Sequence, residues 1–349
     1  MARAPRRTAG DLLAAAAERR RELRVRYEAV RLANGAADGV PGVTLDAFGE
    51  FLVLGVPAEL ALPEPWLDAA HALGARGTYL KRRPRHAARL SEADRLELAP
   101  PRAARGQDAP ETLLVHEAGL VFEVRLGGGL QTGLFLDQRD NRARVRARAR
   151  DGRAARVANL FGYTGAFTVA AAVGGARRTV TVDVSAPALA WAGRNLAHNG
   201  LAGEPHALLR EDAMRWLARA TRRAARDPEA AFDLVVLDPP SFAQTKGGRF
   251  AAEHDYRAAA AHAFGCLAPG GALLACLNHH GIDRTRLLAI LRAALVDAAG
   301  AAPGSPAASG PSAELEALPP PVDFPVSDEE PGGMQSVLVT LPADRRQPW

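Results

Sequence analysis

The sequence predicts an α/β protein in which a doubly wound, mostly parallel sheet is joined to a smaller N-terminal α+β domain. Two observations predict the sheet: from about Asn141 apolar strands alternate with helices, and each strand is a nearly continuous apolar run. A third predicts the smaller domain, because its β-rich runs are separated by the turn dipeptides Asn34-Gly35 and Asp38-Gly39. The length of 349 residues fits two folded units.

The N-terminal part is expected to contain a helix and a hairpin domain. Thr8 and Asp11 form a capping box, which predicts a helix to about Arg24 and a first segment over residues 1–24. The domain at 25–130 is expected to hold strands over 26–32 and 42–56, a helix over 66–73, a strand over 77–81 and a hairpin over 112–126.

Residues 131–349 are expected to form the larger domain. Its predicted strands are 157–161, 179–184, 207–210, 232–237 and 272–277, and its predicted helices are 166–173, 186–199, 213–226 and 255–267. The stretch 300–321 consists mostly of Ala, Gly, Pro and Ser, which predicts a flexible insertion. The final run, 336–341, is expected to be an edge strand.

The composition argues against several classes of protein. No apolar run approaches the roughly 20 residues that span a bilayer and no signal peptide is visible, so a cytoplasmic protein without a membrane partner is expected. The two cysteines, Cys266 and Cys276, have no paired Cys/His spacing nearby, which argues against a disulfide framework and predicts no metal site. Nothing in the sequence predicts an oligomeric state.

The formal net charge of +5 fits a polyanionic partner. Arginines crowd two segments, residues 19–26 and residues 139–150, but arginine is abundant throughout the chain. Each cluster therefore suits a solvated helix face about as well as a track for RNA.

Candidate ligand-binding residues follow the predicted strands, where open α/β sheets bind their ligands. The first strand leads into the turn Asn159 to Phe167, whose small residues let the backbone approach a ligand. The second ends at Asp183, where a ribose diol needs an acceptor, and Glu211-Asp212 follows a third, where a carboxylate suits an adenine amino group. A nicotinamide cofactor is disfavoured because the first turn lacks G-x-G-x-x-G.

The fourth strand ends at Asp238-Pro239-Pro240-Ser241-Phe242. Two successive prolines stiffen the loop that carries the carboxylate and the ring. Phe242 is suited to stack on a flat base, while Asp238 and the Pro239 carbonyl accept hydrogen bonds from the base edge. Such alignment favours methyl transfer, an in-line displacement in which orientation contributes much of the rate.

Together these motifs resemble the bacterial 23S ribosomal RNA large-subunit methyltransferases, both the type that makes 5-methylcytosine and the K/L type whose K half makes 7-methylguanine. The resemblance runs from about Arg31 to Thr340, interrupted near Gly300. Its other motifs are Asn34-Gly35, the run 38–42 and Asp46 in the small domain, and Thr132 to Arg139 before the sheet.

The resemblance implies a Rossmann-like class I fold, S-adenosylmethionine as cofactor, and 23S rRNA or a large-subunit precursor as substrate. It implies that Asp183 and Asp212 contact ribose and adenine. The other cofactor contacts are expected from Phe135, Asp137, Gln138, Arg139, Asn159, Phe161, Tyr163, Thr164, Gly165 and Asp238. One departure is notable, because the 5-methylcytosine type begins with a small RNA-binding domain where this chain has the helix from Thr8. RNA capture is therefore expected to rest on the hairpin domain and the arginines.

The catalytic residues expected are Asp238, Pro239, Pro240, Phe242, Cys276 and Asn278. Carbon-5 of cytosine needs a cysteine thiolate at carbon-6, for which Cys276 is the candidate. Counted from Gly270-Gly271, however, the nucleophile of the cytosine type falls at Asn278, and that asparagine matches one in the K half. Cys276 as a buried strand cysteine and a guanine nitrogen as acceptor therefore stay open.

Two other classes of function remain as alternatives. A methyltransferase of small molecules or proteins would not need the arginine clusters or the separate hairpin domain. A non-catalytic ribosome-binding factor would have no physical reason to retain Asp183, Asp212 and Asp238 together.

Overall fold

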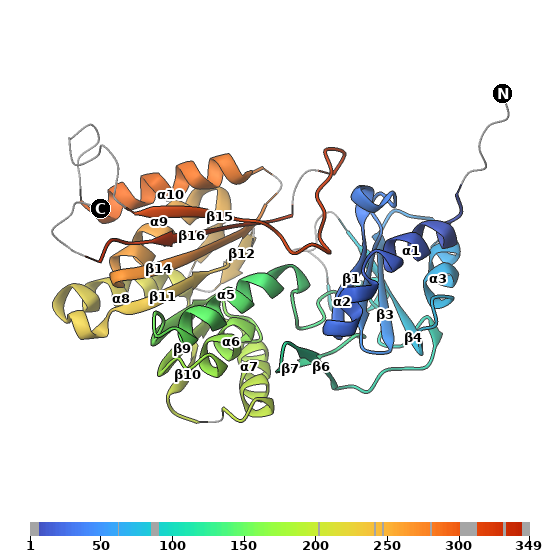
Figure 1. The fold of residues 1–349 in the computed structure, drawn as a ribbon, viewed down its shortest axis with the longest axis horizontal. Helices are drawn as coiled ribbons and strands as arrows, with labels where there is room; N and C mark the ends of the chain where they lie inside the picture. The colour runs from blue at the N-terminus through green and yellow to red at the C-terminus, as the bar shows by residue number, and fades with distance from the viewer. Residues whose placement is uncertain are drawn as a thin grey trace. The chain divides into compact units, whose positions relative to one another are not determined.

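The computed structural model describes residues 7–61, 63–84, 91–201, 203–240, 242–245, 248–279, 281–300, 313–330 and 333–343. The chain forms two compact units (Figure 1). Unit 1 comprises residues 1–139 and 321–331, and unit 2 comprises residues 140–320 and 332–349. The chain therefore passes between the units three times, and each unit is described by itself.

Unit 1 is built on a five-stranded sheet in the order β1-β2-β3-β4-β5. Its strands are β1 (Ala29–Asn34), β2 (Thr44–Phe48), β3 (Phe51–Pro57), β4 (Gly77–Arg83) and β5 (Arg105–Gly106). Helices α1 (Ala9–Glu18) and α3 (Glu64–His71) bury Leu13, Ala16, Leu67 and Ala70 in the same core as the apolar residues of β1 to β3. The unit also contains α2 (Arg21–Arg26), η1 (Gly35–Asp38), α4 (Glu92–Leu98), β6 (Leu113–Glu117), β7 (Leu120–Val124) and η3 (Leu136–Gln138).

The capping box at Thr8 and Asp11 is confirmed, but the expectation of one helix to Arg24 is wrong. The helix ends at Glu18, and a second begins at Arg21. Arg19 and Arg20 at this break both form ion pairs with the buried carboxylate of Asp38, with nitrogen–oxygen distances of 2.6 Å. The break is thus held by two ion pairs that join it to η1, which follows β1.

Unit 2 contains a seven-stranded sheet in the order β10-β9-β8-β11-β14-β16-β15. Its strands are β8 (Arg156–Leu160), β9 (Arg178–Asp183), β10 (His206–Arg210), β11 (Phe232–Leu237), β14 (Leu267–Asn278), β15 (Glu314–Leu318) and β16 (Met334–Thr340). The first five of that order are parallel, whereas β16 is antiparallel to both its neighbours. The doubly wound, Rossmann-like fold expected from the alternating pattern is confirmed.

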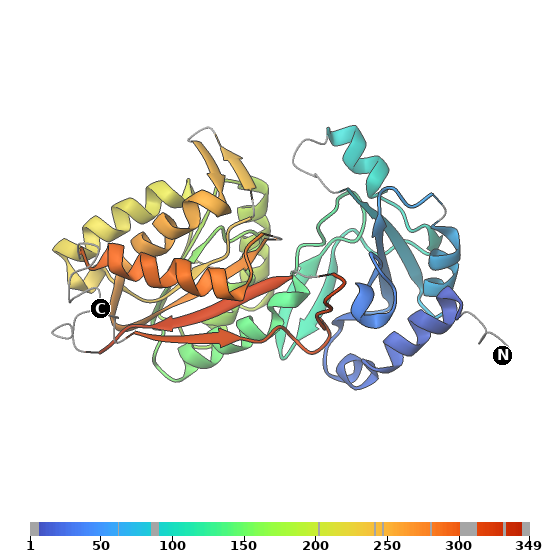
Figure 2. The same cartoon turned by 90° about the horizontal axis from the view of Figure 1, so that it is seen from above.

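Helices cover both faces of this sheet (Figures 1 and 2). One face carries α5 (Arg139–Arg150), α6 (Ala166–Val173) and α7 (Ala186–His198). The other carries α8 (Ala213–Arg226), α9 (Ala252–Gly265) and α10 (Arg284–Ala298), which share one apolar core with β11 and β14. A short hairpin of β12 (Phe242–Thr245) and β13 (Gly248–Ala251) precedes α9. None of the described helices has both the length and the apolar character needed to cross a membrane.

Two expectations about the end of the chain are wrong. Residues 314–318, expected within a flexible insertion, form β15, while residues 301–312 lie outside the described part. The last strand, β16, is not at the edge, because β15 pairs along its other side. The Ala- and Glu-containing sequence of β15 gives little strand signal, and pairing with the apolar β16 overrides it.

Three of the six arginines in the cluster at 139–150 fit neither surface interpretation. Arg139, Arg142 and Arg148 are at most 7% exposed. Arg148 donates to the carbonyl of Gly270 at 3.3 Å, and Arg139 pairs with Asp323. Several of these arginines are therefore buried structural groups of α5, which the sequence could not distinguish from solvated ones.

Candidate active site

The sheet of unit 2 has a topological switch point between β8 and β11. From β8 the chain runs outward to β9 and β10, and it then returns to β11 on the other side of β8. Ligands bind at such points, beyond the carboxyl ends of the strands. The register Leu160↔Leu237 brings the two ends level, so the loops from Phe161 and from Asp238 begin side by side.

The loop after β8 has an unusual backbone. Phe161 and Tyr163 have φ angles of 54° and 48°, and Gly165 has 74°. Left-handed conformations cost about 1–3 kcal/mol at non-glycine residues, so the surroundings must hold them. Asp183 does so in part, because its Oδ2 accepts from the Tyr163 backbone N–H at 2.9 Å.

Side chains beneath this loop support it further. The Asn195 amide donates to the Thr164 carbonyl at 2.9 Å, and the Asn159 amide donates to the Thr168 hydroxyl at 3.0 Å. Both asparagines are buried. Asn159 therefore acts from below the loop as a support, and its expected direct contact with a cofactor stays a prediction.

The carboxylates expected after β9 and β10 lie at the same edge of the sheet. Asp183 is level with Arg210, which directly precedes Glu211-Asp212. Asp183 also accepts from Ser185 N–H at 2.8 Å, while Asp212 caps α8 by accepting from Arg215 N–H at 3.0 Å. The neighbouring Glu211 has a different role, because its carboxylate accepts a hydrogen bond from the Arg219 guanidinium.

The loop after β11 brings Asp238 to the switch point. Asp238 is half-buried, Pro239 is buried and Pro240 is exposed. Ser241 lies outside the described residues, and so does the side chain of Phe242, which begins β12. Because adjacent strands are about 4.8 Å apart and β8 lies between β9 and β11, Asp183 and Asp238 are roughly 10 Å apart along the edge.

The two remaining candidate catalytic residues, Cys276 and Asn278, lie near the end of β14 and differ in burial. Cys276 is fully buried, and its sulfur lies 3.9 Å from the Asn141 amide of α5 and 3.7 Å from the Ser336 hydroxyl of β16. Asn278, two residues further on, is exposed. Cys266 is buried too, and burial raises the pKa of its thiol to about 12.

The run before the sheet belongs to unit 1. Arg139 forms a paired contact with both carboxylate oxygens of Asp323, one of them at 3.0 Å, and both side chains are buried. Phe135 is 41% exposed, whereas Gln138 is buried. The expected contact of Phe135, Asp137, Gln138 and Arg139 with the cofactor stays a prediction.

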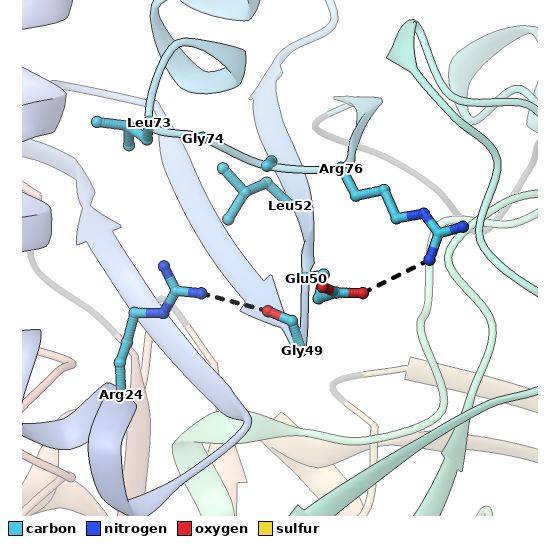
Figure 3. Close-up of a pocket in the computed structure, with 8 residues that line it drawn as sticks. Arg24, Gly49, Glu50, Leu52, Leu73, Gly74 and Arg76 are labelled. Carbon is cyan, nitrogen blue, oxygen red and sulfur yellow. Dashed lines mark hydrogen bonds and ion pairs between the residues drawn. The ribbon is translucent and has the colours of Figure 1, made fainter.

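Unit 1 also has a hollow of about 340 Å³ near the turn between β2 and β3 (Figure 3). Arg24 donates to the carbonyl of Gly49 at 3.2 Å, and Arg76 pairs with Glu50 at 3.6 Å. Both arginines are thus occupied by protein groups. The hollow contains none of the predicted site residues.

Two residues near the site were not expected from the sequence. Val184, next to Asp183, is 43% exposed and offers an apolar surface for a ring. Tyr256 of α9 is fully buried and donates to the Cys276 carbonyl at 3.0 Å. Burial, with Cys276 and Asp238 nearby, raises the pKa of Tyr256 well above its usual value. An exposed valine after an acidic strand end was a usable signal, but the contact of Tyr256 depends on tertiary packing.

These residues fit S-adenosylmethionine by their chemistry. Two carboxylates suit the ribose hydroxyls and the adenine amino group, an exposed valine beside them suits the ring, and the strained loop brings backbone close to the same edge. No cluster of three or more His, Cys, Asp or Glu suited to a metal ion occurs in the described parts of the chain. A doubly wound sheet with acidic residues at the ends of successive strands, here Asp183, Asp212 and Asp238, is the arrangement of the class I methyltransferases.

Comparison with known proteins gives the family. The sequence profile of the S-adenosylmethionine-dependent methyltransferases matches residues 101–301, and the chain belongs to this family. Ribosomal RNA large subunit methyltransferase I of Cronobacter sakazakii is 36% identical over 248 residues, and that of Citrobacter koseri is 36% identical over 251. Each alignment covers 71% of this chain but only 60% of the relative's length.

A solved structure agrees with this result. The crystal structure of SMU.776 in complex with SAH has a TM-score of 0.77 and 25% sequence identity. The match covers 97% of this chain and 83% of the other. The similarity therefore extends through both units and not only the sheet of unit 2.

Proposed function

We propose that this protein transfers the methyl group of S-adenosylmethionine to a base of large-subunit ribosomal RNA. The observation that carries the proposal is the level register of Asp183, Phe161 and Asp238 along the switch point of a methyltransferase sheet. The RNA class follows from relatives that are named ribosomal RNA large subunit methyltransferases. The chain spans 60% of the length of these relatives, so rRNA as its substrate is proposed from the similarity.

In this proposal the residues that follow β8, β9 and β10 hold the cofactor at the carboxyl edge of the sheet. Asp183 accepts from the ribose hydroxyls, Asp212 accepts from the adenine amino group, and Val184 contacts the ring. S-adenosylmethionine supplies a methyl group on a positively charged sulfur. Phe161, Tyr163, Thr164 and Gly165 bring backbone N–H groups and small surfaces toward the sulfur-bearing end.

The acceptor base is held by the loop after β11. Asp238 and the Pro239 carbonyl accept hydrogen bonds from the edge of the base, and Phe242 stacks on its face. Pro239 and Pro240 limit the backbone freedom of the loop, so the base is aligned before transfer. Effective molarities of about 10⁵–10⁸ M for well-oriented reactions make this alignment a large part of the catalysis.

We further propose that the acceptor atom is a ring nitrogen, such as N7 of guanine. A lone pair there attacks the methyl carbon as the carbon–sulfur bond breaks, so no enzyme nucleophile is needed. The burial of Cys276 behind Asn141 and Ser336 supports this route, since a thiolate must reach the base to attack carbon-6 of cytosine. In this proposal Asn278, which is exposed at the strand end, donates to the base.

The test combines binding and chemistry. Isothermal titration with S-adenosylmethionine is expected to show one site, and Asp183→Asn is expected to weaken it about tenfold. Asp238→Asn is expected to lower kcat for rRNA methylation about 100-fold with a smaller change in cofactor affinity. Asp233→Asn, near the opposite end of β11, is the matched control. Binding without methylation of any RNA would instead favour a small-molecule or protein substrate, and no binding would favour a non-catalytic factor.

A further inference from the structure

Helix α8 of unit 2, drawn in yellow in Figure 1, carries five arginines and no Asp or Glu in its 14 residues. At about 100° per residue, all five fall within roughly 100° of arc, and the stripe is roughly 16 Å long. We call this set the α8 stripe: Arg215, Arg219, Arg222, Arg223 and Arg226. All five side chains are exposed.

The buried side of α8 determines which way the α8 stripe faces. Ala213, Trp216, Leu217 and Ala224 are buried, and Trp216 packs on Phe232 with ring centroids 5.6 Å apart. The helix is also anchored to α9, because the Thr221 hydroxyl donates to the His262 carbonyl at 2.8 Å. Rotation of the arginines inward would expose this core, so the stripe faces solvent.

The stripe differs from an ordinary solvated helix face, which mixes both signs of charge. On the same side of the sheet, Arg257 pairs with Asp297 at 2.6 Å and Arg286 pairs with Glu253 at 3.7 Å. On α8, Arg219 is paired with Glu211, but Arg222, Arg223 and Arg226 have no ion pair with any described residue.

This concentration of like charge has a cost. Like charges at i,i+4 spacing destabilise a helix, and three pairs of the stripe have that spacing: Arg215–Arg219, Arg219–Arg223 and Arg222–Arg226. On the neighbouring α9, burial and then the positive charge of Arg222 lower the pKa of His262, so protonation of this histidine beside the stripe is disfavoured. An external polyanion would remove the repulsion.

We infer that the α8 stripe binds the phosphodiester backbone of the RNA substrate and positions it for the site. This inference rests on the proposed function. Guanidinium groups form bidentate contacts with phosphate, and a straight row of them matches a chain of regularly spaced phosphates. A membrane surface is a poorer match, because an interfacial helix needs an exposed apolar face and that of α8 is buried in the core.

The position of α8 in unit 2 also supports RNA as the partner of the α8 stripe. The side chain that caps α8 is Asp212, which follows β10 at the cofactor edge of the sheet. The stripe begins three residues later at Arg215 and runs away from that edge. RNA lying along the stripe is therefore led toward the carboxyl ends of the strands, where the acceptor base is needed.

The test replaces three arginines by glutamine, in Arg222→Gln, Arg223→Gln and Arg226→Gln together. The matched control is Arg284→Gln, Arg286→Gln and Arg292→Gln on α10, whose arginines do not share one face. Both triples lower the formal net charge from +5 to +2, because each removes three positive charges. A third protein, called the lysine protein, carries Arg222→Lys, Arg223→Lys and Arg226→Lys together and retains the charge.

Binding of each protein to 23S rRNA is measured by filter retention between about 50 and 250 mM salt. The α8 triple is expected to reduce the slope of log K against log salt by about 2, since each lost contact to single-stranded phosphate removes about 0.7. KM for RNA is expected to rise at least tenfold with little change in kcat or cofactor affinity. The α10 triple and the lysine protein are expected to keep nearly the parent slope.

Equal slopes for the α8 and α10 triples would overturn the inference and leave the proposed function intact. So would a loss confined to kcat, since phosphate positioning acts on RNA binding. A parent protein that neither binds nor methylates rRNA would overturn the inference and the proposed function together. Thermal unfolding within a few degrees of the parent is required of every variant. If the α8 triple fails to fold, the single changes Arg222→Gln, Arg223→Gln and Arg226→Gln are measured instead, and each is expected to lower the slope by about 0.7.

Discussion

Two buried cysteines allow the route of methyl transfer to be tested at the scale of single residues. Cys276 and Cys266 are both fully buried, but only Cys276 lies at the strand end near Asp238. Cys276→Ala is expected to leave rRNA methylation within about twofold of the parent and to lower stability by about 1 kcal/mol, a typical cost of a core substitution.

Cys266→Ala is the matched control and is expected to behave alike. Both variants are assayed with saturating S-adenosylmethionine and rRNA, and their stability is measured by urea denaturation. Loss of activity in Cys276→Ala alone would contradict the proposed nitrogen acceptor and restore the cytosine route.

The position of the candidate acidic residues at one edge of the sheet could be predicted from the sequence better than their surroundings. Asp183, Asp212 and Asp238 follow apolar runs, and parallel strands bring their carboxyl ends to one edge, so local pattern was enough. The burial of Cys276 depends on Asn141 and Ser336, which are 135 and 60 residues away. No periodicity in the sequence indicates such contacts.

At the scale of elements, the loop after β8 depends on the absence of a side chain at Gly162. A Cβ there would overlap the Thr181 side chain and lie 3.1 Å from the Asn159 amide. Gly162→Ala is expected to lower the free energy of unfolding by about 1–3 kcal/mol, the usual cost of overpacking, and to weaken cofactor binding.

Gly193→Ala provides the contrast within the same unit. Gly193 lies inside α7, where a Cβ would be 3.5 Å from Leu208, an ordinary contact. This change is expected to stabilise the protein by about 0.5–1 kcal/mol. Urea denaturation of both variants, with cofactor titration, checks the pair, and equal effects would contradict the role given to the loop.

The α1–α2 break gives a prediction for pH. Burial raises the pKa of Asp38, but hydrogen bonds from Arg20, Arg19 and the Asn34 N–H outweigh it, so the pKa lies below its ordinary value of 3.8. A carboxylate whose pKa is lowered on folding stabilises the protein above its unfolded pKa and loses this effect as the pH falls through the folded pKa.

Stability is therefore expected to fall as the pH is lowered from about 5 to below 3.8, and less steeply in Asp38→Asn. Thermal unfolding at a series of pH values measures the difference. Parallel curves for the parent and the variant would show that the ion pairs of Arg19 and Arg20 do not contribute.

Elements were predicted well where pattern and packing agree. The strand 232–237 and the helices 166–173 and 213–226 have the expected bounds, since buried apolar runs and an amphipathic helix such as 213–226 leave a local signal. The hairpin β12–β13 and strand β15 were not predicted, because short or polar strands depend on their partners for stability.

At the scale of the whole molecule, the segment 321–331 leaves unit 2 between β15 and β16 and completes unit 1. Its Asp323 is fully buried, pairs with Arg139 and accepts from the Arg31 N–H at 3.0 Å. Asp323→Ala would leave the buried Arg139 without this partner and is expected to cost about 3–5 kcal/mol.

Asp328→Ala is the control, because Asp328 is exposed in the same segment. Denaturant unfolding is expected to show the loss for Asp323→Ala and almost none for Asp328→Ala. Equal stability of the two variants would contradict this role for the segment. The sequence did not indicate it, because Asp323 lies 184 residues from Arg139.

Methyl transfer to rRNA can be measured directly by isotope labelling. Ribosomal RNA from cells that lack the gene is incubated with the protein and S-adenosylmethionine carrying a deuterated methyl group, and its nucleosides are analysed by mass spectrometry. We predict a single labelled base, a methylguanosine with the label on a ring nitrogen, which is lost with Asp238→Asn. Label on ribose or on carbon-5 of cytosine would contradict transfer to a ring nitrogen, and label on no nucleoside would contradict methyl transfer to rRNA.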